Sequence, residues 1–312
     1  MTADNAAGSP DLRIGLVQMS CVSAVSINLD TAETAVRTAA AQNAQVICLQ
    51  ELFATKYFCQ AEDSRRFDLA EEIPGPTTRR FSNVARELGV VLVVPLFERR
   101  AAGVYHNSAV VLDATGEICG VYRKMHIPDD PQFYEKYYFT PGDQGYSVFE
   151  TAFARISVLI CWDQWYPEAA RLAALRGAQI IFYPTAIGWT ADEPIPVRQQ
   201  QQDAWRTVQR SHAIVNGVYV ASVNRVGKEA LGDQTEALEF WGQSFTCDPT
   251  GSVIAEANGT SDEVLIADCD IETIEAQRRT WPFLRDRRVD TYGELSERYI
   301  DSVTFRRESS NS

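Results

Sequence analysis

The chain has 312 residues, of which 45% are hydrophobic and 23% charged, and these proportions exclude a disordered or fibrous protein. Its net charge of −13 argues against nucleic acid or an anionic membrane as a partner, because both bind patches of Lys and Arg. No apolar run approaches the roughly 18 residues of a membrane helix, so no membrane partner is expected.

The first third of the chain alternates strand-like and helix-like segments. Apolar residues recur at helical spacing over 25–42, and a short apolar run such as 46–50 is typical of a buried strand. A hairpin turn is predicted at 113–116, between strands over 105–112 and 117–123. The other elements predicted in this part are strands over 12–19 and 90–97 and a helix from about 77 to 89.

The alternation continues after a long loop over 124–145, which is rich in Pro, Asp and aromatic residues. No break in composition divides the chain, so residues 12–279 predict one α/β domain with helices outside the sheets. Residues 1–11 are expected to form a flexible tail. Residues 280–312 form a C-terminal extension whose aromatic and Arg-rich start suits a subunit contact. Strands are predicted over 155–160, 178–184, 218–224 and 264–269, helices over 167–176, 199–216 and 271–279, and a hairpin over 242–257.

Three residues with reactive side chains come directly after predicted strands: Glu51, Lys124 and Cys161. The ends of strands are where α/β folds place functional groups. A thiolate is a nucleophile, a carboxyl group in apolar surroundings can move protons, and an ammonium group can stabilise an oxyanion. Taken singly, each is better explained as a buried cysteine, a solvated glutamate or a surface lysine.

The sequences around these three residues are more specific in combination than any one of them. They are Leu-Gln-Glu51-Leu-Phe, Tyr-Arg-Lys124-Met-His and Leu-Ile-Cys161-Trp-Asp. In this order the chain resembles the nitrilase superfamily of carbon–nitrogen hydrolases, from residue 12 to about 288. The resemblance implies a Glu–Lys–Cys catalytic triad, with Glu135 as a second glutamate near the lysine. It also implies an α-β-β-α sandwich, a single domain with two central mixed sheets and outer helices.

Longer stretches resemble the N-carbamoylputrescine amidase branch of this superfamily. The implied reaction is the hydrolysis of N-carbamoylputrescine to putrescine, ammonia and carbon dioxide through a thioester on Cys161. In that reaction Glu51 moves the protons, and Lys124 and the backbone N–H of Trp162 stabilise the oxyanion. The stretches that carry this closer resemblance are 124–131, 133–143, 161–171 and 183–188.

The far end of such a substrate is a cationic amine, which carboxylates or aromatic faces recognise. The segment 189–196 departs from the pattern of the branch, so the identity of the substrate tail stays open. One alternative is another N-carbamoyl-amine or N-carbamoyl-amino-acid hydrolase, similar to β-ureidopropionase, in which Arg198 or Arg225 binds a carboxylate. Broader amidase or nitrilase activity and a non-catalytic module are further alternatives, although the last is expected to lack the triad. The candidate substrate-binding residues are His126, Trp165, Trp189, Asp192 and Glu193.

The seven cysteines are scattered without a Cys-x-x-Cys pair, and the three histidines lie far apart. This pattern does not fit a metal site, and we expect no cofactor. Scattered thiols that stay reduced indicate a cytoplasmic protein. The resemblance further implies a homo-oligomer, a dimer or larger, and a small ureido or amide substrate.

Overall fold

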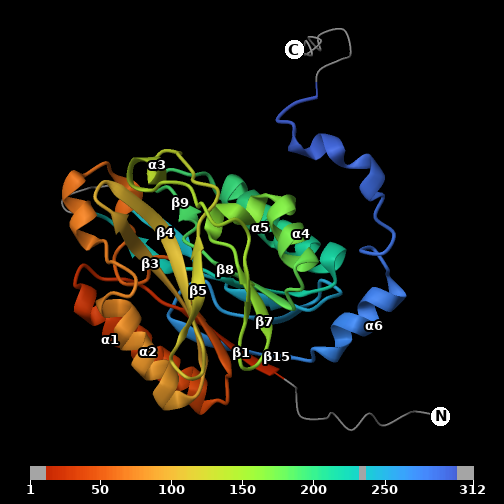
Figure 1. The fold of residues 1–312 in the computed structure, drawn as a ribbon. Helices are drawn as coiled ribbons and strands as arrows, with labels where there is room; N and C mark the ends of the chain where they lie inside the picture. The colour runs from red at the N-terminus through yellow and green to blue at the C-terminus, as the bar shows by residue number, and fades with distance from the viewer. Residues whose placement is uncertain (1–11, 232–236, 301–312) are drawn as a thin grey trace, which may run out of the picture.

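The computed structural model describes residues 12–231 and 237–300, and its centre is a pair of six-stranded sheets that mix parallel and antiparallel pairs (Figure 1). In spatial order, the first sheet contains β15 (Glu263–Cys269), β1 (Leu12–Gln18), β2 (Val46–Leu49), β3 (Val91–Ala101), β4 (Val104–Leu112) and β5 (Ile118–Arg123). The second contains β14 (Val253–Glu256), β13 (Phe245–Cys247), β10 (Tyr219–Val223), β8 (Ile180–Pro184), β7 (Arg155–Val158) and β6 (Val148–Glu150).

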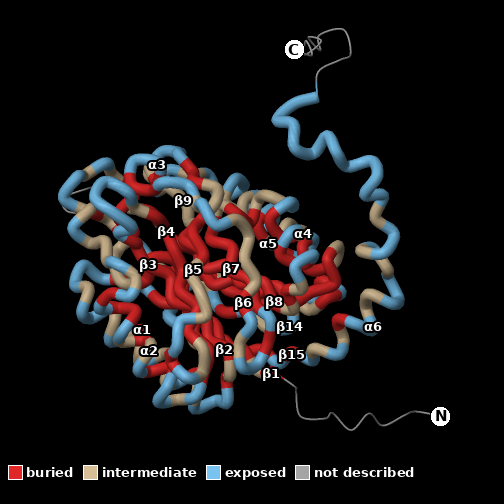
Figure 2. The backbone as a smooth tube through the Cα atoms, viewed as in Figure 1, coloured by how far each residue is buried: buried red, intermediate tan, exposed pale blue. Residues whose placement is uncertain are grey.

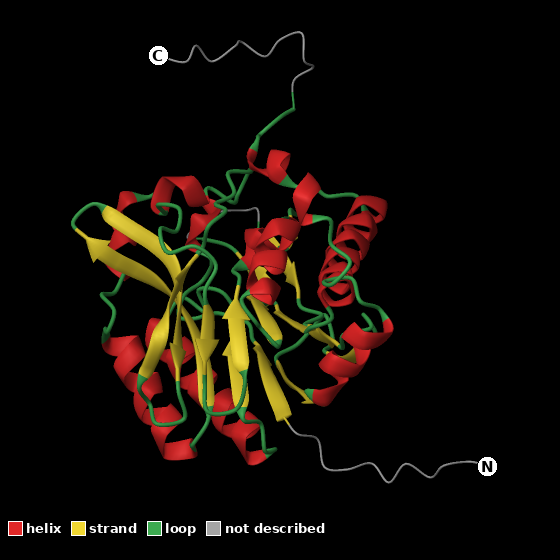
Figure 3. Cartoon of the chain, turned by 45° about the vertical axis from the view of Figure 1, so that its right-hand side comes forward, coloured by secondary structure: helices red, strands yellow, loops and turns green. Residues whose placement is uncertain are grey.

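Helices cover the outer face of each sheet, so the domain has four layers (Figures 1 and 3). On the first sheet lie α1 (Val25–Ala41) and α2 (Pro76–Leu88). On the second sheet lie α4 (Pro167–Leu175) and α5 (Ile195–Asn216). The predicted α-β-β-α sandwich with two mixed sheets is therefore confirmed.

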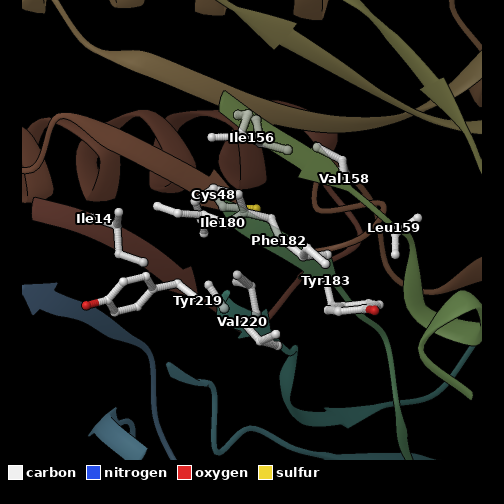
Figure 4. Close-up of a cluster of buried hydrophobic side chains, with 14 of the residues drawn as sticks. Ile14, Cys48, Ile156, Val158, Leu159, Ile180, Phe182, Tyr183, Tyr219 and Val220 are labelled. Carbon is white, nitrogen blue, oxygen red and sulfur yellow. The ribbon is translucent and has the colours of Figure 1, made fainter. Parts of the chain in front are cut away.

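The central strands are buried on both faces, because each sheet lies between a layer of helices and the other sheet (Figure 2). Along β1, Leu12, Ile14 and Leu16 belong to the core between the sheets, whereas Val17 packs with α1 and α2. Figure 4 shows Ile14 and Cys48 of the first sheet among side chains of the second. Burial on both faces explains why these strands read as continuous apolar runs.

The ends of the helices mostly follow local sequence signals. A proline begins α2, and Gly89 follows the helix in the left-handed conformation, with φ at +66°. The helix predicted over 199–216 begins earlier, at Ile195. Pro194 precedes it with extended backbone, and Pro196 is accepted because the first turn of a helix needs no N–H donor there.

The structure also contains a small third sheet that the sequence did not predict. It has the order β11 (Val226–Glu229), β12 (Leu238–Trp241) and β9 (Gly188–Trp189). Strands of two to four residues are too short to show a period. The predicted hairpin over 242–257 is present as β13 and β14. The short elements of the remaining loops are α3 (Glu135–Tyr138), η1 (Phe58–Gln60) and η2 (Ser64–Leu69).

The chain leaves the body of the domain after α6 (Glu272–Thr280), and residues 281–300 are largely exposed (Figures 1 and 2). This segment contains η4 (Val289–Thr291) and η5 (Gly293–Ser296). The expected N-terminal tail, 1–11, and the end of the C-terminal extension lie outside the described residues. No helix of the described part is long and apolar enough to cross a membrane.

Candidate active site

Strand ends of both sheets carry the three residues singled out by their motifs. Glu51 and Lys124 follow β2 and β5 of the first sheet, and Cys161 follows β7 of the second. Lys124 Nζ lies 2.8 Å from Glu51 Oε1 and 2.6 Å from Oε2 of Glu135, the first residue of α3. All four side chains are buried, and Cys161 interacts electrostatically with the other three. We call Glu51, Lys124 and Glu135 the charged cluster.

Cys161 is the first residue of η3 (Cys161–Trp165), and its φ of +45° is one that residues other than glycine rarely adopt. Asp163 holds this turn, because its Oδ2 accepts a hydrogen bond from the Ile160 N–H at 3.0 Å. The Cys161 Sγ lies 3.9 Å from the carbonyl oxygen of Ala186. Backbone strain of this kind persists only where the surroundings hold it, and it is concentrated at functional sites.

The Cys161 thiol needs a base. Burial, with Glu51 adding to it and Lys124 opposing it, raises the pKa of the thiol well above its ordinary value, so the thiol is neutral at neutral pH. Glu51 Oε1 accepts hydrogen bonds from Lys124 and from Asn107 Nδ2, the latter at 2.7 Å. Glu51 Oε2 is buried and has no partner among the described residues, so it is free to accept a proton.

Lys124 keeps its charge in a fully buried position. Burial disfavours the ammonium, but Glu135 and Glu51 outweigh it and raise the pKa of Lys124 well above its ordinary value. Burial also raises the pKa of Glu135 to about 7, against the effect of Lys124. The Tyr57 hydroxyl donates to Glu135 Oε1 at 2.8 Å. An ammonium fixed between two carboxylates can stabilise a negative charge that develops next to it.

Asp163 connects the turn at Cys161 with the segment that follows Lys124. It accepts hydrogen bonds from the Tyr122 hydroxyl at 2.6 Å and from both the backbone N–H and the ring Nδ1 of His126, at 2.9 and 2.7 Å. The His126 ring also stacks on Tyr166, with 3.6 Å between the ring centres. His126 is thus occupied by structural contacts and does not line the pocket described next.

A pocket of about 780 Å³ opens beside Cys161 and Glu135. Of the predicted substrate-binding residues, Trp165, Asp192 and Glu193 line it, as does Trp162. Four carboxylates contribute to the lining, whereas no Lys, Arg or His of the described residues does. Glu135 is paired with Lys124, so the excess negative charge of the wall comes from the other three carboxylates, and it favours a cationic ligand over an anionic one. The four carboxylates belong to Asp130, Glu135, Asp192 and Glu193.

Three further candidates lie behind the pocket wall. Trp189 packs against Trp241, which does line the pocket, and the Arg198 guanidinium lies over the Trp189 ring. Arg198 also donates to the Glu193 carbonyl. Arg225 is fully buried and bound within the protein. The described residues therefore place neither arginine where it would meet a substrate carboxylate, and they contain no group of metal-ligating side chains.

Sequence reasoning missed Tyr57, Asn107 and Asp163. Asp163 stands within the quoted motif around Cys161, but its role depends on contacts with distant residues. Asn107 lies in the polar segment 106–108, just before the apolar run 109–112, and nothing in the sequence distinguishes it from its two polar neighbours. The sequence around Tyr57 carries no comparable signal, because its contact with Glu135 spans 78 positions of the chain.

Comparisons with known proteins identify the family of the chain. The family model described as Carbon-nitrogen hydrolase matches residues 13–279. A Solanum lycopersicum protein named N-carbamoylputrescine amidase is 45% identical over 282 residues, which are 89% of this chain and 93% of the relative. A Francisella tularensis protein named citrullinase is 40% identical over 290 residues, covering 93% and 99%. The crystal structure of a carbon-nitrogen hydrolase from Helicobacter pylori G27 has a TM-score of 0.89 at 44% identity, covering 93% and 99%.

Proposed function

Since this chain belongs to the carbon–nitrogen hydrolase family, we propose that it hydrolyses N-carbamoylputrescine to putrescine, ammonia and carbon dioxide. The observation that carries the proposal is the pocket beside Cys161, which is lined by four carboxylates and, among the described residues, by no cationic side chain. N-carbamoylputrescine has a ureido group for the thiol to attack and an ammonium group at its other end. The identity to relatives of that name supports the same substrate.

In the first half of the proposed reaction, Glu51 Oε2 takes the proton of the Cys161 thiol, and Sγ attacks the ureido carbon. The carbonyl oxygen becomes an oxyanion that accepts hydrogen bonds from Lys124 Nζ and the Trp162 N–H; one such donor typically contributes about 10²–10³ in rate. Glu51 then returns the proton to the terminal nitrogen as the carbon–nitrogen bond breaks. Ammonia leaves, and a carbamoyl thioester remains on Cys161.

In the second half, Glu51 acts as a base toward water. The water attacks the thioester carbon, the same donors stabilise the oxyanion, and the carbon–sulfur bond breaks with the proton returning to sulfur. The released N-substituted carbamate decays to putrescine and carbon dioxide. Glu135 supports both halves by keeping Lys124 charged and in place, at 2.6 Å.

For the substrate tail, we propose that Asp192 and Glu193 bind the ammonium group and that Trp165 offers it an aromatic face. Gln201 Nε2 donates to Glu193 Oε1 at 2.7 Å, and this bond orients the carboxylate. His126 and Trp189 then contribute indirectly, through Asp163 and through Trp241.

Citrulline is the second candidate substrate, because the relative named citrullinase is 40% identical. Citrulline has the same ureido group, but its other end carries a carboxylate as well as an ammonium group. A pocket with no cationic lining residue in the described part gives that carboxylate no partner. We therefore rank it below N-carbamoylputrescine, together with N-carbamoyl-β-alanine.

The test is ammonia release from N-carbamoylputrescine, citrulline and N-carbamoyl-β-alanine, with Cys161→Ala protein as the blank. We expect the highest kcat/KM for N-carbamoylputrescine and no turnover by the variant. A preference for either acid would leave the reaction type standing and refute the proposed tail recognition. Turnover by Cys161→Ala would refute the mechanism.

We also propose a cytoplasmic location without a cofactor, and a homo-oligomeric state. All seven cysteines are free thiols, which suits a reducing compartment. The domain limits that we propose are 12–279 for the hydrolase domain, with the tail 1–11 before it and the extension 280–312 after it.

A further inference from the structure

We infer that the buried ion pair between Arg225 and Glu229 positions both glutamates of the charged cluster, and that it thereby controls the rate of the chemical step. Neither residue lines the pocket. The inference rests on the proposed roles of Glu51 and Glu135. It gives Arg225 a function different from the substrate-carboxylate binding considered from the sequence.

The first contact of the pair is with the turn that carries Glu51. After β2 the backbone reverses through Leu52, whose φ is +50°. The reversal leaves buried carbonyl groups without strand partners, and such groups need donors. Arg225 Nη2 supplies them: it lies 3.3 Å from the Glu51 carbonyl oxygen, 2.7 Å from that of Leu52 and 2.9 Å from that of Thr55. One guanidinium nitrogen thus lies within 3.3 Å of three carbonyl oxygens of the turn.

The second contact of the pair leads to Glu135. Glu229 binds Arg225 Nη1 with both of its oxygens, at 2.7 and 2.9 Å. Glu229 Oε2 also accepts the backbone N–H of Tyr57 at 2.6 Å. The hydroxyl of the same tyrosine donates to Glu135. One ion pair is therefore connected to both carboxylates that flank Lys124, through the backbone of Glu51 and through Tyr57.

The chemistry of the pair favours a positioning role over a purely stabilising one. Both side chains are at most 1% exposed, and a buried ion pair adds little net stability, because the cost of desolvating two charges offsets their attraction. An arginine can donate in two directions from one rigid plane, toward Glu229 and toward the turn, which a lysine ammonium cannot reproduce. Displacements of about 1 Å in a catalytic group cost up to roughly 10²-fold in rate.

Arg225→Lys tests the inference, because it keeps the charge and removes the planar fork. We expect kcat per folded molecule to fall about 10- to 100-fold, while KM stays within about threefold because the pair does not contact Asp192 or Glu193, the residues proposed to bind the substrate tail. Near-ultraviolet circular dichroism measures the folded fraction. Glu229→Gln keeps the side-chain volume and is used if Arg225→Lys does not fold; a fall of kcat of about fivefold or more at unchanged KM is expected for it. Arg206→Lys, at an arginine paired with Glu256 on the surface, is the matched control.

Two results would overturn the inference. The first is a folded variant whose kcat stays within about twofold of wild type. The second is a loss of activity that only follows the loss of folded protein, since that is what a structural role predicts. The ratio of variant to wild type can be measured on any amide that the wild type hydrolyses. Failure of the wild type on N-carbamoylputrescine therefore tests the proposed function separately.

Discussion

The ammonium group of Lys124 is buried completely, and two carboxylates lie within 2.8 Å of it. Without them, burial would favour the neutral amine, which is a poor partner for an oxyanion. Burial raises the pKa of Glu135 to about 7, and the charge of Glu51 adds to this rise while Lys124 opposes it. The protonation state of Glu135 is therefore sensitive to pH near neutrality.

Glu135→Gln is expected to remove the acidic limb from the pH profile of kcat/KM. Because the pKa of Glu135 is about 7, it is ionised above that pH and protonated below it. Only the ionised form of Glu135 adds to the stabilisation of the Lys124 charge, so wild-type kcat/KM should fall as the pH drops through about 7. At high pH the Glu135→Gln variant should be slower than wild type by roughly 10²-fold. The measurement is kcat/KM as a function of pH across this range, with Glu150→Gln at an exposed position as the control. An acidic limb that persists unchanged in Glu135→Gln would contradict the prediction.

Glu193→Gln is expected to raise KM for N-carbamoylputrescine about tenfold with little change in kcat, because we propose that the charge of Glu193 binds the substrate tail and not the reacting atoms. N-carbamoylbutylamine lacks the ammonium group, so its KM should not change. Asp203→Asn removes an exposed charge from α5 and serves as the matched control. Equal effects on both substrates would count against recognition of the amine by Glu193.

At this scale the sequence predicts residues that carry motifs and misses those that act only through space. Glu51, Lys124 and Cys161 were predicted from short stretches that also mark the ends of strands. Tyr57 could not be, because it contacts Glu135 across 78 positions of the chain, and Arg225 was considered only as a ligand for a substrate carboxylate.

Among the elements, the junction between η3 and the end of β5 connects the turn at Cys161 with the segment that carries Lys124. Asp163 is its centre: four N–H or O–H donors point at one buried carboxylate. The donors come from Tyr122, His126 and Ile160, so the carboxylate joins both sheets. A substitution of Asp163 is therefore expected to affect η3 and the end of β5 together.

Asp163→Asn is expected to destabilise the fold and slow the reaction, because an amide nitrogen cannot accept hydrogen bonds and leaves donors unpaired. An unsatisfied buried donor costs about 1–3 kcal/mol, so a loss of roughly 2–4 kcal/mol is expected in urea unfolding. The control Asp143→Asn also loses a charge, but that side chain is 60% exposed and paired with Arg123. Similar stabilities for the two variants would contradict the role given to Asp163.

How well the elements could be predicted depends on their length and burial. Strands buried on both faces, such as β8 and β10, show as apolar runs, and α2 shows through its proline and glycine. The strands β9, β11 and β12 could not be predicted, since two to four residues carry no period and their partners are distant. The early start of α5 was not predicted, although a proline in the first turn is compatible with a helix.

The whole molecule consists of a layered domain followed by a C-terminal segment that makes few contacts with that domain. Residues 281–300 expose large side chains, including Trp281 at 51% and Leu295 at 66%. Exposed apolar groups on an extended segment are typical of a surface that another chain covers. Together with the resemblance found in the sequence, they support the proposal of a homo-oligomer with a second copy of this chain at that segment.

Deletion of residues 281–312 is expected to lower the mass of the particle in solution without removing the charged cluster, which lies wholly before it. Light scattering coupled to size exclusion should give a dimer or larger for the full chain and a smaller particle for the shortened one. A full chain that is monomeric at micromolar concentration would contradict the proposed subunit contact.

The division of the site between two sheets also has a consequence for when activity appears as the chain folds. Glu51 and Lys124 follow strands of the first sheet and Cys161 follows a strand of the second, so neither sheet alone contains both the proposed nucleophile and its proposed base. A chain in which only one sheet has formed is therefore expected to have no catalytic activity. Recovery of catalysis during refolding thus reports the docking of the two sheets and should lag behind the return of secondary structure.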